Sequence, residues 1–251
     1  MNKKHTAIGV SVLALVLAGI GSSVYYSGKL DQNASSKHQG TQEVVSALQG
    51  NLTNKDLENE QSYKIPESDK KSKDYVSSGS ASEVGQFTIS PQGIKTTLLL
   101  NKTTNINVSN GPIKYNISQI QLFSNETKTE GAITAAQMAL NTRDINGEFI
   151  TMQVSYSVEN ETDKHVVTDG IRAAGFTNGK TVSLSGGLDN DYTLAATGLN
   201  PGEKKQTYVL LLVPKDLLKN INHVDLQFAS VSDSENGSKI VNDSDQQAVD
   251  F

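Results

Sequence analysis

Alternation of apolar and polar residues is the feature that most narrows the folds open to this chain. The segment EFITMQVSYSVEN, residues 148–160, repeats with a period of two. Because successive side chains of a β-strand point to opposite faces, this segment predicts a strand with one buried face and one solvated face. The predicted buried face carries Ile150, Met152, Val154, Tyr156 and Val158, and the predicted solvated face carries Thr151, Gln153, Ser155 and Ser157.

A second segment shows the same period with one interruption. GPIKYNISQIQLFS, residues 111–124, alternates from Ile113 to Ile117 and resumes out of phase at Ile120. An extra residue in a strand shifts the alternation in this way, so we expect a β-bulge near Ser118–Gln119. Other segments predict further strands: GQFTIS (85–90), IKTTLLL (94–100), TNINVS (104–109), KTVSLSG (180–186), DYTLAAT (191–197) and HVDLQFASV (223–231).

The run YVLLLV, residues 208–213, is apolar at every position and follows a turn signal at Pro201–Gly202. Such a run predicts a strand that is buried on both faces. Helical spacing between the strands is confined to GAITAAQMALNTRD, residues 131–144. We therefore predict an all-β fold, an immunoglobulin-like antiparallel β-sandwich with one short inter-strand helix, over residues 85–232.

Three segments, in this order, resemble a known domain. They are GPIKYNISQIQLF, FITMQVSYSVENETDKHV and LNPGEKKQTYVLLLVPKDL, and the match covers about residues 110–231. The combination resembles the immunoglobulin-like, telokin-like domain of unknown function carried by exported lipoproteins and membrane-anchored proteins of Gram-positive bacteria. The family's pattern has the same residues at the positions of Asn160, Pro201, Gly202, Glu203 and Pro214. The resemblance implies a β-sandwich and export, and it transfers no functional residue, because the family has no established catalytic activity.

The first 28 residues form a region of their own. Two lysines precede a stretch without charge from residue 6 to residue 28. Its length is near the ~20 residues that cross a bilayer, so we predict a membrane helix at residues 7–26. Basic residues favour the cytoplasmic side, which places the C-terminal domain outside the cell, anchored by a single pass through the cell membrane. Secretion after cleavage of a signal peptide is the alternative. The segment LAGI resembles a lipoprotein box, but Ile20 replaces the lipid-bearing cysteine.

The composition of two further regions predicts little packed structure. Residues 29–84 are rich in Ser, Asn, Gln, Lys and acidic residues, which is typical of a polar linker or flexible stalk. Within this linker, apolar residues near helical spacing favour a short helix at 41–58: Val44, Val45, Leu48 and Leu52. The last residues, 233–251, are polar and acidic and predict a disordered tail.

Composition excludes several classes of partner and cofactor. The formal net charge is −5, and no basic patch with interleaved aromatic residues occurs, so we predict no nucleic-acid partner. Cysteine is absent, which excludes disulfides, thiolate metal sites and cysteine nucleophiles. The sequence has no phosphate-binding glycine loop and no pair of zinc ligands, so we predict no cofactor.

Two acidic clusters have residue types that could bind calcium. The first is GGLDNDYT, with Asp189, Asn190 and Asp191, and the second is SDSENGSKIVNDSD, with Asp233, Glu235, Asp243 and Asp245. Calcium prefers such oxygen ligands, but neither cluster has EF-hand spacing. Asp and Asn side chains also form turns, so we predict no metal site and keep calcium as the alternative.

His165 is the main candidate for a catalytic residue. It lies in the turn NETDKHVV near Asp163 and several serines, which are the residue types of a hydrolase triad. No G-x-S-x-G segment accompanies them, so we predict no catalytic residues and no enzymatic activity.

The predicted function is therefore that of a non-enzymatic, exported cell-surface protein. Its monomeric β-sandwich would act as a binding or structural module at the cell envelope, in contact with an unknown protein or envelope component. We expect these contacts at loops, because a sandwich presents its loops at its ends, and the loop 185–191 and the turn 159–165 are the candidates. An exported hydrolase that uses His165 is the alternative.

Overall fold

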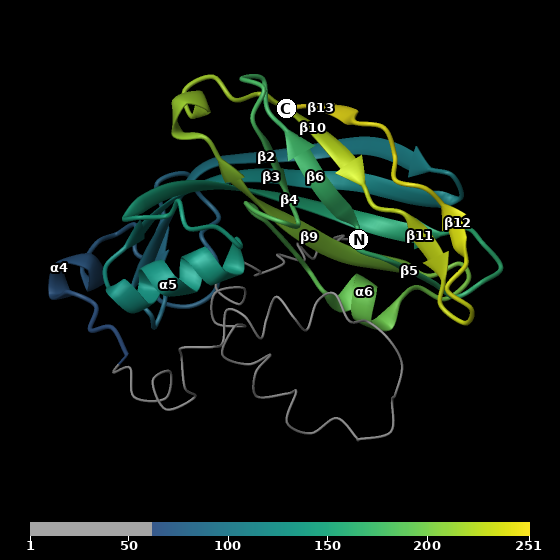
Figure 1. Ribbon diagram of the computed structural model, residues 1–251. Coiled ribbons are helices and arrows are strands. Elements are labelled where there is room, and N and C mark those ends of the chain that lie inside the picture. Colours follow the sequence, from purple (N-terminus) through teal and green to yellow (C-terminus); the bar gives the residue numbers. More distant parts are fainter. Residues whose placement is uncertain (1–61) are drawn as a thin grey trace, which may run out of the picture.

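The computed structural model describes residues 62–251, which form three antiparallel β-sheets and a few short helices (Figure 1). The largest sheet has the order β1 (Phe87–Ile89), β2 (Ile94–Asn110), β3 (Ile113–Thr127), β4 (Glu148–Asn160), β9 (Lys204–Val213) and β8 (Leu188–Asn190). The second sheet has the order β13 (Gln247–Asp250), β10 (His223–Phe228), β6 (Ile171–Gly175) and β7 (Thr181–Ser183). The third has the order β12 (Lys239–Val241), β11 (Val231–Asp233) and β5 (Val166–Thr168). The helices are α4 (Glu67–Lys70), α5 (Glu130–Ala139), α6 (Thr193–Thr197) and the 3-10 helix η2 (Lys215–Leu217).

Three of the predictions fall wholly or partly outside the described residues. The membrane helix at 7–26 and the short helix at 41–58 lie outside them, as does the linker up to residue 61. Within residues 62–251, no helix combines the length and the apolar character that crossing a membrane requires.

The two larger sheets pack against each other around a common core, and β6 and β10 cross the long strands in Figure 1. The predicted inner face of β4 lies in this core, and Met152, Val154 and Tyr156 are almost wholly buried there. Phe228 of β10 lies against Tyr115 of β3, with ring centroids 4.0 Å apart. The prediction of an antiparallel β-sandwich is therefore confirmed.

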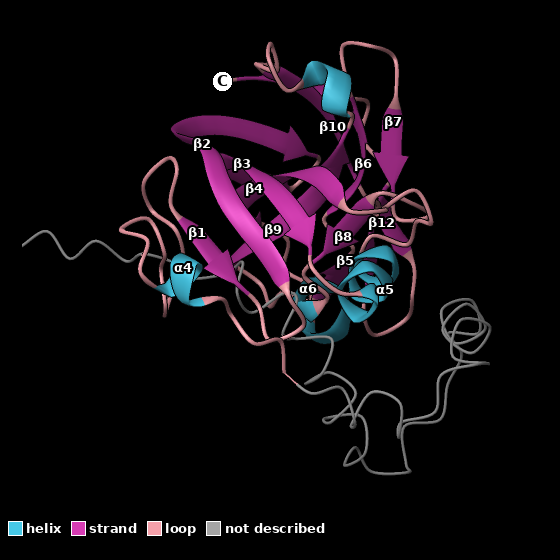
Figure 2. Cartoon of the chain, turned by 90° about the vertical axis from the view of Figure 1, so that its left-hand side faces the viewer, coloured by secondary structure: helices cyan, strands magenta, loops and turns pink. Residues whose placement is uncertain are grey.

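The strand β9 is buried on both faces, as its unbroken apolar run predicts. Val209 and Leu211 belong to the core between the sheets. Leu210 lies on the other face, in a cluster that includes residues of α5. Figure 2 shows α5 below β8. A helix on one face and a sheet on the other bury the apolar run 209–211 of this strand on both sides.

The predicted inter-strand helix is confirmed as α5. Thr129 caps its first turn, because the Thr129 side chain accepts a hydrogen bond of 3.0 Å from the Ala132 N–H. Ala132 and Ala136 are buried, and their small side chains let the helix lie close to the sheet. The chain leaves the helix through Asn141, whose φ of 43° is in the left-handed region that Asn tolerates at helix ends.

The predicted bulge is also confirmed, because the pairing of β3 with β4 shifts register between Ile117 and Gln119. Two segments that were expected to be separate strands, 94–100 and 104–109, form the single strand β2. Register shifts between Leu98 and Leu100, and between Thr103 and Ile106, mark the irregularities that separate the two patterns in the sequence.

One predicted strand is wrong. The segment DYTLAAT at 191–197 contains the helix α6. Its first turn is held by Asp191, whose Oδ1 accepts hydrogen bonds from the Thr193 N–H at 3.0 Å and the Thr193 hydroxyl at 2.7 Å. Leu194 is the buried residue of this helix, so a single apolar contact and local hydrogen bonds override the weak alternation.

The predicted disordered tail is wrong as well. Residues 233–251 contain β12 and β13, and Val249 of β13 is fully buried in the core between the sheets. Between these strands Ser244 pairs with Phe228 in both directions, since each backbone N–H donates to the other residue at 2.9 Å. Short polar segments order here because strands already in place supply partners for their backbone groups.

The linker ends earlier than predicted. Residues 62–84 pack on the sandwich, whereas the sequence pattern predicts that the sandwich begins at residue 85. Tyr63 donates its backbone N–H to the Pro91 carbonyl at 2.7 Å. Ala81 forms a buried cluster with Leu98 and Phe123. The packed unit therefore extends from residue 62 to residue 251.

Candidate functional site

The face of the large sheet that points away from the second sheet, called the outer face here, is unusually rich in carboxamides. Residues directly opposite each other in antiparallel strands share a face, so the register assigns three consecutive rows to it. The first row is Asn101, Gln121, Gln153, Leu210 and Asp189; the second is Thr103, Gln119, Ser155 and Tyr208; the third is Asn107, Asn116, Ser157 and Gln206. We call these thirteen residues the amide rows, because seven of them are Asn or Gln.

The amide rows form their own hydrogen bonds across strands. Gln119 donates to the Asn101 side chain at 2.7 Å, and Asn116 donates to the Asn105 and Asn107 side chains at 2.6 and 2.9 Å. Asp189 is the ionisable carboxylate among the thirteen, and none of them is Lys, Arg or Glu. The next row along the strands is charged, and there Lys204 pairs with Glu159 at 3.5 Å.

Gln153 lies in the first row and has an unsatisfied acceptor. Its Nε2 donates along the face to the Ser155 hydroxyl at 3.1 Å. The side chain is only 3% exposed, and its buried Oε1 has no hydrogen-bond partner among residues 62–251. A buried acceptor without a partner costs about 1–3 kcal/mol, so Gln153 lowers the stability of the fold at this position.

Part of the predicted solvated face of β4 is therefore not solvated. Thr151, Gln153 and Ser157 are all buried. Thr151 lies under α5, Gln153 lies between Gln121 and Leu210, and Ser157 lies between the larger side chains of Asn116 and Gln206. A central strand is flanked on both sides, and this position in the sheet is not visible in the strand's own alternation.

The edge of the first row carries a carboxylate and two tyrosines. Burial raises the pKa of Asp189 to about 6, and a hydrogen bond with the Tyr192 side chain partly opposes this rise. Burial also raises the pKa of Tyr208, and the negative charge of Asp189 adds to the rise. Tyr192 itself is 71% exposed. This corner combines an aromatic ring open to solvent with a carboxyl group that is partly protonated near neutral pH.

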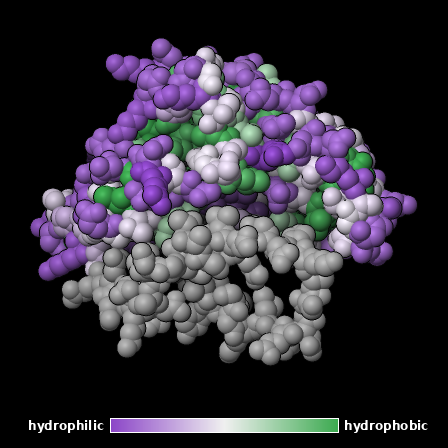
Figure 3. Space-filling view, viewed as in Figure 1, coloured by the Kyte–Doolittle hydropathy of each residue, from purple (hydrophilic) through white to green (hydrophobic). Residues whose placement is uncertain are grey.

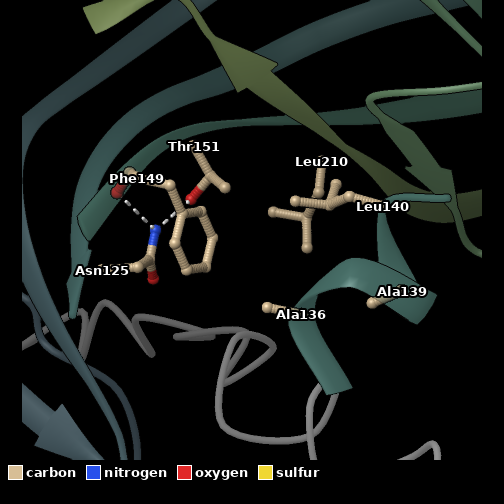
Figure 4. Close-up of a pocket in the computed structure, with 7 residues that line it drawn as sticks. All are labelled: Asn125, Ala136, Ala139, Leu140, Phe149, Thr151 and Leu210. Carbon is tan, nitrogen blue, oxygen red and sulfur yellow. Dashed lines mark hydrogen bonds between the residues drawn. The ribbon is translucent and has the colours of Figure 1, made fainter. Parts of the chain in front are cut away.

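A small pit lies between α5 and the outer face (Figure 4). Its volume is about 20 Å³, and its walls are Asn125, Ala136, Ala139, Leu140, Phe149, Thr151 and Leu210. Asn125 is already satisfied, since it donates to Thr151 at 2.9 Å and accepts from Thr96 at 3.0 Å. A space of this size holds about one water molecule, so the pit is a local packing gap and not a substrate pocket.

His165 contacts a serine, although not through the triad that the sequence suggests. Its Nδ1 lies 2.7 Å from the Ser234 hydroxyl, and its Nε2 lies 3.0 Å from the Thr197 carbonyl oxygen. A carbonyl only accepts, so Nε2 carries the proton and Nδ1 accepts from Ser234. The ring is oriented by a carbonyl in the place where a triad has a carboxylate, and Asp163 is not among its hydrogen-bond partners.

The acidic residues of the two predicted clusters have separate structural roles. Asn190 points to the opposite face from Asp189 and donates to the Asp169 carbonyl at 2.7 Å. Asp233 pairs with Lys164 at 2.9 Å, and Asp243 accepts from the Ser230 N–H at 2.8 Å and pairs with Arg172. Among residues 62–251, no three acidic or histidine side chains converge in a way that would hold a metal ion.

The two predicted contact segments are also tied into the fold. In the loop 185–191, Gly187 donates to the Leu140 carbonyl and accepts from the Leu212 N–H, both at 2.7 Å. In the turn 159–165, the fully buried Asn160 donates to the carbonyl oxygens of Lys164, Leu199 and Asn200 at 2.8–3.0 Å. The backbones of both segments are therefore fixed by internal hydrogen bonds.

The amide rows were missed because they are a property of register. Four of the strands contribute three side chains each and β8 contributes one, and no short segment of the sequence contains the set. The available signal was the identity of the polar residues between the apolar ones in β2, β3, β4 and β9, which are mostly Asn, Gln, Ser and Thr. The face of the molecule drawn in Figure 3 is mostly hydrophilic, with hydrophobic residues interspersed.

Comparison with known proteins finds similarity at the level of structure. No family model matches the sequence, and no curated protein is similar to it. A functionally unknown protein from Listeria monocytogenes EGD-e is similar in structure, with a TM-score of 0.42 and 11% sequence identity. That similarity covers 62% of this chain and 86% of the Listeria chain.

Proposed function

We propose that this chain is a non-enzymatic binding module of the cell envelope, and that the amide rows are its binding surface. The observation that carries the proposal is the content of these rows: seven carboxamides and four hydroxyl groups on one sheet face. Polar groups that are matched only in part by the protein favour a polar ligand.

The location rests on the N-terminal sequence. The uncharged stretch from residue 6 to residue 28 follows two lysines, and this pattern supports a membrane anchor with the sandwich outside the cell. The resemblance to the immunoglobulin-like, telokin-like domain supports the same placement and the immunoglobulin-like class. Secretion after signal cleavage remains the alternative, and both place the amide rows outside the membrane.

The test is co-sedimentation of the full-length chain with insoluble cell-wall material from a Gram-positive bacterium. The chain is kept in a polyoxyethylene detergent, which contains no sugar. We expect the wild type to sediment with the wall and the double variant Gln119→Ala/Gln121→Ala to remain largely in solution. A matched control is Asn220→Ala, an exposed amide in the loop before β10. Equal sedimentation of the wild type and the double variant would contradict the proposal.

The alternative function, an exported hydrolase, is supported by the 2.7 Å contact between His165 and Ser234. A hydroxyl that donates to an imidazole nitrogen is the arrangement that activates a serine nucleophile. It is tested by measuring turnover of ester, peptide and glycosidic substrates by the wild type and by His165→Ala and Ser234→Ala. Turnover that is lost in both variants while both keep their fold would replace the binding module by the hydrolase.

A further inference from the structure

We infer that the ligand of the amide rows is an uncharged polysaccharide, that is, a chain of sugar rings rich in hydroxyl groups and free of phosphate and carboxylate. This inference rests on the proposed function, because it names the ligand of the same surface.

The first argument is the match of hydrogen-bonding groups. A carboxamide has two donors and an acceptor, and a sugar hydroxyl also donates and accepts. The carboxamides that are not buried, such as Gln119 and Gln121 on β3, therefore offer both kinds of partner to successive hydroxyl groups.

The second argument is charge. Binding of a polyanion, such as a nucleic acid or a phosphate-linked polymer, needs Lys or Arg on the binding surface. The amide rows contain neither, and Asp189 adds a carboxyl group. In the adjacent charged row, Lys204 pairs with Glu159, and Lys114 pairs with Glu161. The surface therefore disfavours an anionic ligand and accepts a neutral one.

The third argument is the shape and edge of the surface. The rows extend across five strands and along three positions of each central strand, an area of about 19 by 13 Å from the ordinary spacings of a sheet. Tyr192 lies at one end beside Asp189, and its ring is largely exposed. The C–H face of a sugar ring packs against an aromatic ring because both surfaces are apolar, so Tyr192 is suited to hold the end of the ligand.

The experiment is isothermal titration calorimetry of the full-length chain in the same sugar-free detergent. The probes are cellohexaose, chitohexaose and maltohexaose, with a heparin hexasaccharide as the anionic comparison. We expect at least one neutral probe to bind with an affinity that is independent of salt, since screening acts only on charges.

Loss of two hydrogen bonds in Gln119→Ala/Gln121→Ala, or of the ring in Tyr192→Ala, should weaken this binding about tenfold each. Asn220→Ala should bind as the wild type does. Circular dichroism checks that every variant is folded.

Each other outcome contradicts the inference in a way that can be distinguished from failure of the proposed function. If no neutral probe binds, or if only heparin binds, while sedimentation with cell wall still depends on Gln119 and Gln121, the ligand class is wrong and the binding surface stands. If a probe binds equally to all variants, the site lies elsewhere. If the double variant only loses thermal stability and the wild type binds nothing, the amide rows hold another segment of this chain.

Discussion

A buried polar side chain stabilises this fold when its hydrogen-bonding groups all have partners, and destabilises it when they do not. Asn160 is fully buried, donates to three carbonyl oxygens, and accepts from the Thr162 N–H at 2.9 Å. Asp189 is almost as deeply buried, but its surroundings favour the protonated form. Substitution of Asn160 is therefore expected to lower the stability of the protein, and substitution of Asp189 is expected to raise it.

Replacing Asn160 by Ala should destabilise the protein by about 2–4 kcal/mol, because buried carbonyl groups lose their donor. The measurement is chemical denaturation of the full-length chain, monitored by circular dichroism. Asn220→Ala, at an exposed amide, is the matched control and should change the free energy of unfolding by less than about 0.5 kcal/mol. An unchanged free energy for Asn160→Ala would show that its hydrogen bonds are not needed.

Replacing Asp189 by Asn should stabilise the protein at pH 8 and have little effect at pH 4. The folded pKa of about 6 lies above the unfolded value of 3.8, so the unfolded state releases its proton first and stability falls as the pH rises through this window. A difference of about two pKa units corresponds to roughly 2–3 kcal/mol. Thermal unfolding at both pH values measures the effect, with the exposed Asp163→Asn as control. A variant that is less stable than the wild type at pH 8 would contradict the assignment.

At the scale of elements, the C-terminal strand β13 is held by a histidine. His223 of β10 lies between two carboxylates, with Nδ1 2.7 Å from Asp250 of β13 and Nε2 3.1 Å from Asp225. Hydrogen bonds with Asp250, and then with Asp225, raise the pKa of His223, while partial burial opposes the rise. Protonated His223 thus bridges the two strands.

This bridge predicts a pH dependence for β13. Because the folded pKa is raised, the contribution of His223 is complete below the unfolded value of about 6.5 and is lost as the pH rises through the folded pKa. Hydrogen exchange at the amides of residues 247–250, corrected for the intrinsic rate, should show lower protection at pH 8.5 than at pH 6. In His223→Asn this difference should disappear. Equal pH dependence in both proteins would show that His223 does not hold the strand.

Elements with a strong pattern of their own were predictable from the sequence, and elements that depend on a partner were not. The strand β4, the bulge after Ile117 and the helix α5 each carry a local signal in periodicity. The strand β13 has one deeply buried residue, Val249, and its order comes from pairing with β10. The helix α6 similarly depends on one buried leucine and on hydrogen bonds of Asp191.

At the scale of the whole molecule, both ends of the described chain complete the sandwich. Residues 62–84 cover Leu98 and Phe123 through Ala81, and β13 covers one edge of the second sheet. The amide rows likewise arise only when five strands are in register, which explains why sequence patterns predicted the sandwich and missed its candidate site.

Fragments test the extent of this unit. A fragment of residues 62–251 should unfold cooperatively, whereas a fragment of residues 85–232 should aggregate or unfold without a sharp transition, because Phe228 and the core beside it lose the cover of β13. Thermal unfolding of both fragments and of the full-length chain shows whether each of them unfolds in a sharp transition, and at what temperature. A sharp transition at the same temperature for the shorter fragment would show that the ends are dispensable.

The central claim is that the amide rows are the binding surface, and side-chain amide NMR of the full-length chain tests it most directly. Each Asn and Gln side chain gives its own NH₂ signals, which can be assigned through single substitutions and followed during titration with cellohexaose, chitohexaose and maltohexaose. The account predicts that a binding probe shifts the signals of Gln119, Gln121 and Asn116, while those of Asn178 and Asn220 stay in place. Shifts confined to the loop 185–191 or the turn 159–165, or no shifts with any probe, would contradict it.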